Sequence, residues 1–141
     1  MRKFTILFSF CFLFCALAGA AKIPLLPAKK FPLTAASIVP AATGRAEVGA
    51  DKNGNSKVKI TVEHLAKPEH LTPPKNAYVV WFQETGGTPE AEGQLKVNKN
   101  LKTAFETTTP WKNFQILITA EDDPTAKTPS GPEVLRTAVT R

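Results

Sequence analysis

The amino-acid sequence predicts an all-β protein, an immunoglobulin-like sandwich of two antiparallel sheets with about seven strands. Three observations support this fold class. Apolar and polar residues alternate in several short segments, proline and glycine residues separate these segments, and no window of useful length has the spacing of an amphipathic helix. Short strands at close intervals are typical of two packed sheets.

The first 20 residues have the layout of a secretory signal peptide. Arg2 and Lys3 precede an apolar run over residues 4–17, and Ala-Gly-Ala follows at 18–20. The run has about 14 residues, fewer than the ~20 that a membrane-spanning helix needs. We therefore expect cleavage near Ala20, a secreted or periplasmic protein and no stable membrane span. The alternative is an uncleaved signal that anchors the protein.

Composition limits the class of protein further. Both cysteines, Cys11 and Cys15, lie in the signal, so the mature chain is expected to be cysteine-free and to contain no thiolate metal site. Small secreted eukaryotic domains usually rely on disulfides, so this composition favours a bacterial cell envelope. The 18 basic and 12 acidic residues are interleaved along the chain. A nucleic-acid surface requires a basic stripe with stacking aromatic residues, and we expect none.

Residues 21–40 contain four of the 12 prolines of the chain. Because proline at this density disfavours both helices and central strands, we predict an extended tether here. Ile38 and Val39 are candidates for a short edge segment. The sandwich domain is then expected to cover residues 41–141.

The first predicted strands form a hairpin over residues 42–48 and 58–62, in which side chains alternate between apolar and polar. A two-residue turn at Asn53-Gly54 would place Val48 opposite Lys59, so that the apolar faces disagree. A three-residue loop over 52–54, with Gly54 in the left-handed conformation as a bulge, brings them into agreement. This register pairs Val48 with Val58 and Ala46 with Ile60.

The remaining strands are predicted at 77–83, 93–97, 103–107, 114–121 and 134–140. Residues 77–83 are apolar on both faces, which is typical of a central strand. We expect Trp81 of this strand to be enclosed between the two sheets. Turn residues occupy 86–89, and a turn-rich stretch follows over 122–132.

Several motifs after residue 77 carry a resemblance to a known family. They are the strand from Tyr78 to Trp81, the pair Gly86-Gly87, the strand start at Gly93, Thr119 to Glu121 at a strand end, and Pro129-Ser130-Gly131-Pro132 before the last strand. Residues 78–135 thereby resemble the extracytoplasmic C-terminal domain of the anti-sigma-K factor family. In such domains Thr119, Glu121, Pro129 and Gly131 are expected to form structural corners.

The resemblance covers less than half of the chain. Members of that family carry a sigma-binding helical domain and a membrane span before this outer domain, and neither is found here. We therefore expect no contact with a sigma factor. The family has no catalytic residues to transfer.

Few residues are candidates for chemistry. His64 and His70, each preceded by glutamate, would form a zinc or copper site only with a further ligand, for which Glu121, Asp122 and Asp123 are the candidates. The other interpretation is two hydrated histidines. Residues 51–55 differ from a calcium-binding loop, because glycine stands at the fourth position and not at the sixth. No glycine-flanked nucleophile is found either, so we expect neither an enzyme nor a cofactor.

Trp111 follows a proline in a predicted loop and is a candidate contact for a partner or a glycan, or else a cap on the core. We expect a non-catalytic binding or structural domain of the envelope, with an envelope protein or a glycan as its partner. Recognition is expected in the loops 65–76, 86–93 and 122–132, or by strand addition at an open sheet edge. The alternative is a small metal-binding protein or metal-dependent enzyme that uses His64 and His70.

Overall fold

The computed structural model describes residues 27–141. This part of the chain contains eight strands, one 3₁₀ turn (η1, Pro68–His70) and no α-helix. No helix in it is long and apolar enough to cross a membrane. The strands are β1 (Lys29–Ala35), β2 (Thr43–Ala50), β3 (Ser56–Glu63), β4 (Ala77–Glu84), β5 (Glu90–Leu95), β6 (Thr103–Thr109), β7 (Asn113–Glu121) and β8 (Glu133–Thr140).

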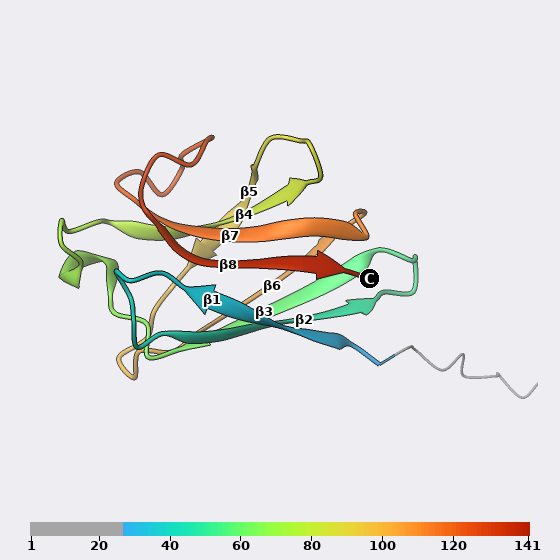
Figure 1. Ribbon diagram of the computed structural model, residues 1–141, viewed down its shortest axis with the longest axis horizontal. Helices are drawn as coiled ribbons and strands as arrows, with labels where there is room; N and C mark the ends of the chain where they lie inside the picture. Colours follow the sequence, from blue (N-terminus) through green and yellow to red (C-terminus); the bar gives the residue numbers. More distant parts are fainter. Residues whose placement is uncertain (1–26) are drawn as a thin grey trace, which may run out of the picture.

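All strand pairs are antiparallel and form one sheet of eight strands in the order β5-β4-β7-β8-β1-β2-β3-β6. Figure 1 shows β4, β7 and β8 on one side of the molecule and β1, β2 and β3 on the other. The two ends of this order, β5 and β6, approach each other. The hydroxyl of Thr107 donates to Glu92 Oε2 at 3.1 Å, so the sheet is nearly closed.

Gly93 of β5 permits this close approach. Its φ is 156°, and the register of β5 against β4 shifts between Val80 and Trp81. A Cβ atom at this position would lie 2.7 Å from Cε2 of Phe105 in β6. Only glycine combines this backbone conformation with the space that the Phe105 ring requires.

The predicted tether at 21–40 is wrong for residues 29–35, which form β1 inside the sheet. Residues 29–33 pair with β2, and Thr34 and Ala35 pair with β8. At Pro32, β1 is paired with β2 alone and is an edge of the sheet on its other side. Proline, which has no N–H to donate, is tolerated at such an edge position. The described domain therefore begins before residue 41. Ile38 and Val39 lie in a turn between β1 and β2 and form no edge strand.

The β2–β3 hairpin has the predicted register, with Ala46 opposite Ile60 and Val48 opposite Val58. Gly54 has a φ of 83°, as the bulged loop requires. Its N–H donates to the carbonyl of Asp51 at 3.1 Å. Matching of the apolar faces thus determined the loop type.

β4 is buried on both faces from Ala77 to Phe82, as predicted. Tyr78, Val80 and Phe82 contribute to the main core inside the sheet. Val79 and Trp81 lie on the opposite face and form a second, smaller cluster with Leu117 of β7 and Ala126. Trp81 is fully buried, but the prediction that it is enclosed between the two sheets is wrong, because residues after β7 cover it from outside.

Candidate functional site

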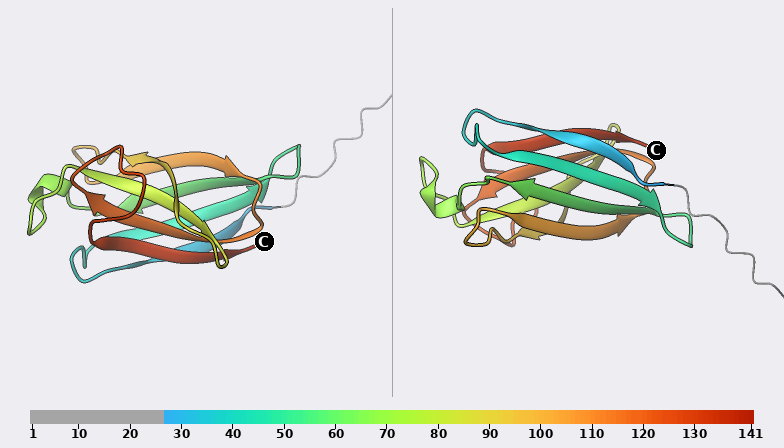
Figure 2. Two further views of the ribbon diagram at one scale, coloured as in Figure 1. Left: turned by 90° about the horizontal axis from the view of Figure 1, so that it is seen from above. Right: turned by 90° about the horizontal axis from the view of Figure 1, so that it is seen from below.

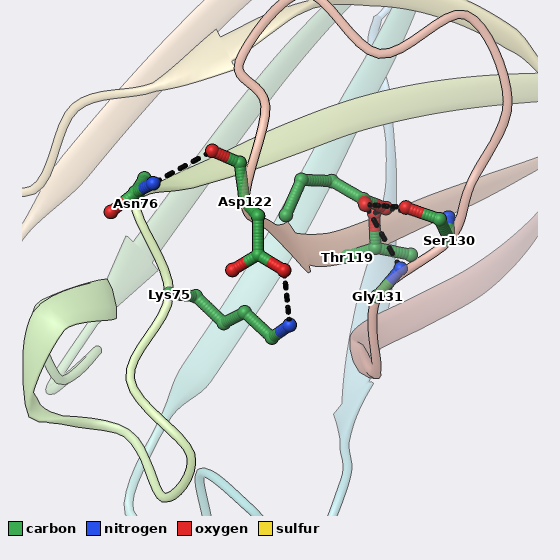
Figure 3. Close-up of polar contacts among 7 residues, drawn as sticks. Lys75, Asn76, Thr119, Asp122, Ser130 and Gly131 are labelled. Carbon is green, nitrogen blue, oxygen red and sulfur yellow. Dashed lines mark hydrogen bonds and ion pairs between the residues drawn. The ribbon is translucent and has the colours of Figure 1, made fainter.

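Glu121, the last residue of β7, is fully buried and accepts four hydrogen bonds. Its Oε1 accepts from the Thr119 hydroxyl at 2.5 Å and from the Ser130 N–H at 3.0 Å. Its Oε2 accepts from the Ser130 hydroxyl at 2.6 Å and from the Gly131 N–H at 2.9 Å. Thr119 Oγ1 also accepts from Trp81 Nε1 at 2.8 Å. One hydrogen-bond network therefore joins the buried end of β7 to the surface loop over residues 122–132 (Figure 3).

The charge of Glu121 is stabilised by these donors and not by a cation, since no ion pair of the described residues includes it. Burial alone would raise the pKa of this carboxyl. The hydrogen bonds from Ser130, Thr119 and Gly131 outweigh burial and lower the pKa below its ordinary value. The donors of the loop over residues 122–132 thus keep the carboxylate ionised, and the carboxylate in turn holds this loop against β7.

Gly131 allows the loop over residues 122–132 to return close to β7. A Cβ atom here would lie 1.7 Å from the carbonyl oxygen of Ala120, a distance that backbone atoms cannot tolerate. The neighbouring backbone is also paired, since the Ala120 N–H donates to the Pro132 carbonyl at 2.9 Å. A glycine is therefore required where the loop closes.

A second set of contacts joins this loop to the connection between β3 and β4. Lys75 Nζ lies 2.8 Å from Asp122 Oδ2, and Asn76 Nδ2 donates to the Asp122 carbonyl at 2.8 Å (Figure 3). The Asn76 N–H donates to the Glu121 carbonyl at 3.0 Å. Two of the three loops in which we expected recognition, 65–76 and 122–132, are thus adjacent, and their common surface is called the loop end below.

The third predicted loop lies elsewhere. Ala77 of β4 pairs with Glu121, whereas Glu84 pairs with Phe114, so the turn after Glu84 is at the opposite end of β4. This turn contains Gly86, whose φ is 78°. The stretch 90–93 belongs to β5 and not to a loop.

A groove of about 490 Å³ runs between β5 and the loop over 122–132. A second hollow of about 210 Å³ shares Gln94 and Lys96 with it and continues to residues 67–69. Gln94 Nε2 donates to the Pro124 carbonyl at 3.3 Å and ties the two walls together. The lining residues of the groove are Val79, Ala91, Glu92, Gly93, Gln94, Lys96, Pro124, Thr125, Ala126 and Lys127. Sequence reasoning missed the groove, because its walls are about 30 residues apart in the chain.

The structure brings together four of the residues that the family resemblance singled out, Trp81, Thr119, Glu121 and Gly131. Two others lie apart. Tyr78 is in the main core, where its hydroxyl donates to the Ala66 carbonyl at 2.8 Å, and burial raises its pKa to about 12. Gly93 lies where β5 approaches β6. Pro129 is half-buried in the loop over 122–132.

His64 and His70 are both exposed. Within residues 27–141, no group of three or more His, Cys, Asp or Glu side chains comes together in a way that could hold a metal ion. Of the predicted further ligands, Glu121 is bonded within its loop and Asp122 to Lys75. The structure gives the metal interpretation no support, and Cys11 and Cys15 lie outside the described residues.

Trp111 is half-buried and packs against the main core. Its carbonyl accepts from the Ser56 hydroxyl at 2.6 Å, and its N–H donates to Thr109 Oγ1 at 3.3 Å. These contacts agree with a residue that caps the core. A hollow of about 390 Å³ beside it also includes Lys112, so the predicted contact with a partner stays a prediction.

These residues define an all-β, antiparallel protein with a fastened loop and an adjacent groove. No protein-family model matches the chain, and neither a curated protein nor a solved structure matches it. The resemblance of residues 78–135 to the anti-sigma-K factor family gains no support from these comparisons.

Proposed function

We propose that the protein is an exported, non-catalytic binding domain that recognises an envelope protein or a glycan at the loop end. The observation that carries this proposal is that two sets of contacts, the Glu121 hydrogen bonds and the Asp122 contacts, hold the loop over 122–132 in place. An open groove lies next to this loop. A binding surface benefits from such rigidity, because less conformational entropy is lost when a ligand binds.

We also propose that the nearly closed sheet is an immunoglobulin-like sandwich. The strand order divides into β5-β4-β7-β8 and β1-β2-β3-β6. The chain passes from one half to the other after β3, after β5 and after β6, while β1 pairs with both halves. Such crossings are typical of sandwiches, whose loops cluster at the two ends.

The groove itself favours a ligand that combines polar and apolar groups. Its lining includes the apolar side chains of Val79 and Ala126 together with Gln94, Lys96 and Lys127. Neither of the two lysines forms an ion pair within residues 27–141. Their ammonium groups therefore remain available for carboxylate or hydroxyl groups of a partner.

The proposal is tested by binding of the mature chain to arrays of glycans and to fractionated envelope proteins. The double variant Lys96→Glu/Lys127→Glu should lose the ligand that the wild type retains, because it reverses both positive charges of the groove. Lys99→Glu changes an exposed lysine outside the groove and should have no effect. Equal retention by all three proteins would place recognition elsewhere.

Export has its own test, which is N-terminal sequencing of the protein purified from its source. We expect a start near Ala21. A start at Met1 would contradict cleavage and favour the anchored form.

A further inference from the structure

The end of the molecule opposite the loop end gathers four cationic side chains, Lys29, Lys52, Lys112 and Arg141. We call it the basal end. Both views in Figure 2 show the start of β1, the β2–β3 hairpin loop and the C-terminal residue at this end. Lys52 lies in the hairpin loop, and Arg141 directly follows β8. The first strand of the domain therefore begins beside a patch of positive charge.

Backbone carbonyls, and not carboxylates, hold three of these cations. Lys29 Nζ donates to the Thr140 carbonyl at 3.5 Å, while Lys112 Nζ and Arg141 Nη2 both donate to the carbonyl of Gly54. Arg141 Nη1 also donates to the Asn55 carbonyl at 2.7 Å. Two positive charges thus share one acceptor.

Acidic side chains offset these charges only in part. In the described part of the chain none of the four cations is in an ion pair, whereas Lys57, Lys59, Lys75 and Lys102 each are. The carboxylate of Asp51 in the same hairpin loop accepts the N–H groups of Asn53 and Asn55, both at 2.8 Å. Glu84 lines the same hollow as Lys112, so Asp51 and Glu84 offset part of the charge. The four cations outnumber these two carboxylates, and the basal end keeps a local excess of positive charge that an external anion can compensate.

The position of this patch along the chain indicates which anion. Lys29 is the first residue of β1, and the apolar run over residues 4–17 ends only a short distance before it in the sequence. A chain delivered to or held at a membrane through that run presents the basal end to the lipid surface first. Trp111, the neighbour of Lys112, adds a half-buried indole of the kind that is enriched at membrane interfaces.

We propose that the basal end binds an anionic lipid surface and thereby directs the loop end away from the membrane. Each lysine or arginine near an anionic membrane contributes about 1 kcal/mol, and the attraction falls off within a Debye length of roughly 10 Å. Only cations on one end of the molecule act together in this way. The orientation leaves the groove beside the loop over 122–132 free for its partner.

The test is co-sedimentation of the mature chain, residues 21–141, which contains every described element, with phosphatidylglycerol-containing vesicles. The triple variant Lys29→Gln/Lys52→Gln/Lys112→Gln should bind these vesicles on the order of 100-fold more weakly, which corresponds to about 1 kcal/mol for each charge removed. The matched variant Lys67→Gln/Lys99→Gln/Lys102→Gln removes the same charge at the loop end, outside the lining of the groove beside β5, and should bind like the wild type. Pure phosphatidylcholine vesicles should bind none of them.

Equal weakening by both triple variants would overturn the proposal, because net charge alone would then explain binding. So would failure of the wild type to bind the anionic vesicles, or tighter binding to a soluble polyanion such as heparin. If Lys112→Gln disturbs the hairpin loop, the double variant Lys29→Gln/Lys52→Gln keeps the comparison, since both side chains are exposed. Binding in the groove is tested at Lys96 and Lys127, which neither triple variant changes, so either proposal can fail without the other.

Discussion

At the scale of single residues, Glu121 shows how a buried charge can organise a surface loop. Carboxylates are costly to bury unless their oxygen atoms are satisfied. Here two hydroxyl and two amide donors supply four hydrogen bonds, and three of the four come from Ser130 and Gly131 in the loop. The cost of burying the charge is thus offset only while the loop is closed.

Replacing the carboxylate tests this dependence. We expect Glu121→Gln to lower the free energy of unfolding at pH 7 by about 1–3 kcal/mol, because an amide group cannot accept all four bonds. The folded-state pKa of Glu121 is lowered from 4.5, so its contribution is present above that pH and is lost as the pH falls through the folded-state pKa. The difference between variant and wild type in urea denaturation should therefore shrink in acid.

Glu84→Gln is the matched control, since Glu84 is exposed at the far end of β4, and it should leave stability unchanged. A Glu121→Gln variant that is equally destabilised at neutral and acidic pH would show that the loss comes from altered packing and not from the ionised carboxylate.

Gly131 provides a second test at this scale. Gly131→Ala should destabilise the protein by about 3 kcal/mol or more, because the added carbon overlaps the Ala120 carbonyl and the loop must open. Gly86→Ala carries only the cost of its positive φ, about 1 kcal/mol, since no atom lies within 4 Å of its added carbon. In a Trp111→Phe background, a red-shifted fluorescence of Trp81 for Gly131→Ala alone would report the open loop. Equal effects of both variants would contradict this account.

At the scale of elements, features set by neighbouring residues could be predicted from the sequence. Burial of a residue by a segment distant in the chain could not. The hairpin register followed from alternation in two neighbouring strands, because turn and pairing there lie close in sequence. Burial of β4 on both faces also followed from its composition. The cover over Trp81 could not be predicted in the same way, because it comes from Ala126 in a loop with no apolar pattern of its own.

β1 was missed for a different reason. The four prolines of residues 21–40 argue against a strand, and propensity does not reveal that Pro32 occupies a stretch with a single neighbouring strand. The groove was missed as well, because no local pattern relates Gln94 to Pro124. Pairing and coverage between distant segments are decided by the fold and are not visible in any one segment.

The importance of β1 for the core can be measured at Leu33. This side chain is 7% exposed, and its methyl carbon packs near Gly44 of β2. We expect Leu33→Ala to lower the free energy of unfolding by about 2–4 kcal/mol, the usual loss for a buried leucine. Thr34→Ala, at an exposed position of the same strand, should change it by less than about 0.5 kcal/mol. If both variants have equal, small effects in urea denaturation, residues 29–35 contribute little to the core and act as a tether.

At the scale of the whole molecule, the sheet nearly closes, and its weakest line is the boundary between β5 and β6. These strands have a backbone partner on one side only, whereas β3 and β7 are paired on both sides. Across the boundary, the contacts are the Thr107–Glu92 hydrogen bond and the approach of Phe105 to Gly93. Side-chain contacts therefore hold β5 and β6 together, whereas backbone hydrogen bonds join the other neighbouring strands.

Hydrogen exchange should reveal this boundary. Amide protons of β5 and β6 that point away from β4 and β3 have no strand partner, so they should exchange fastest among the strands, and those of β3 and β7 should exchange slowest. Thr107→Val should accelerate exchange in β5 and β6 while leaving β7 unchanged, because it removes the hydroxyl bonded to Glu92 but keeps the side-chain volume. Protection of β5 and β6 equal to that of β7 would mean that the sheet closes fully in solution. The boundary would then not be its point of opening.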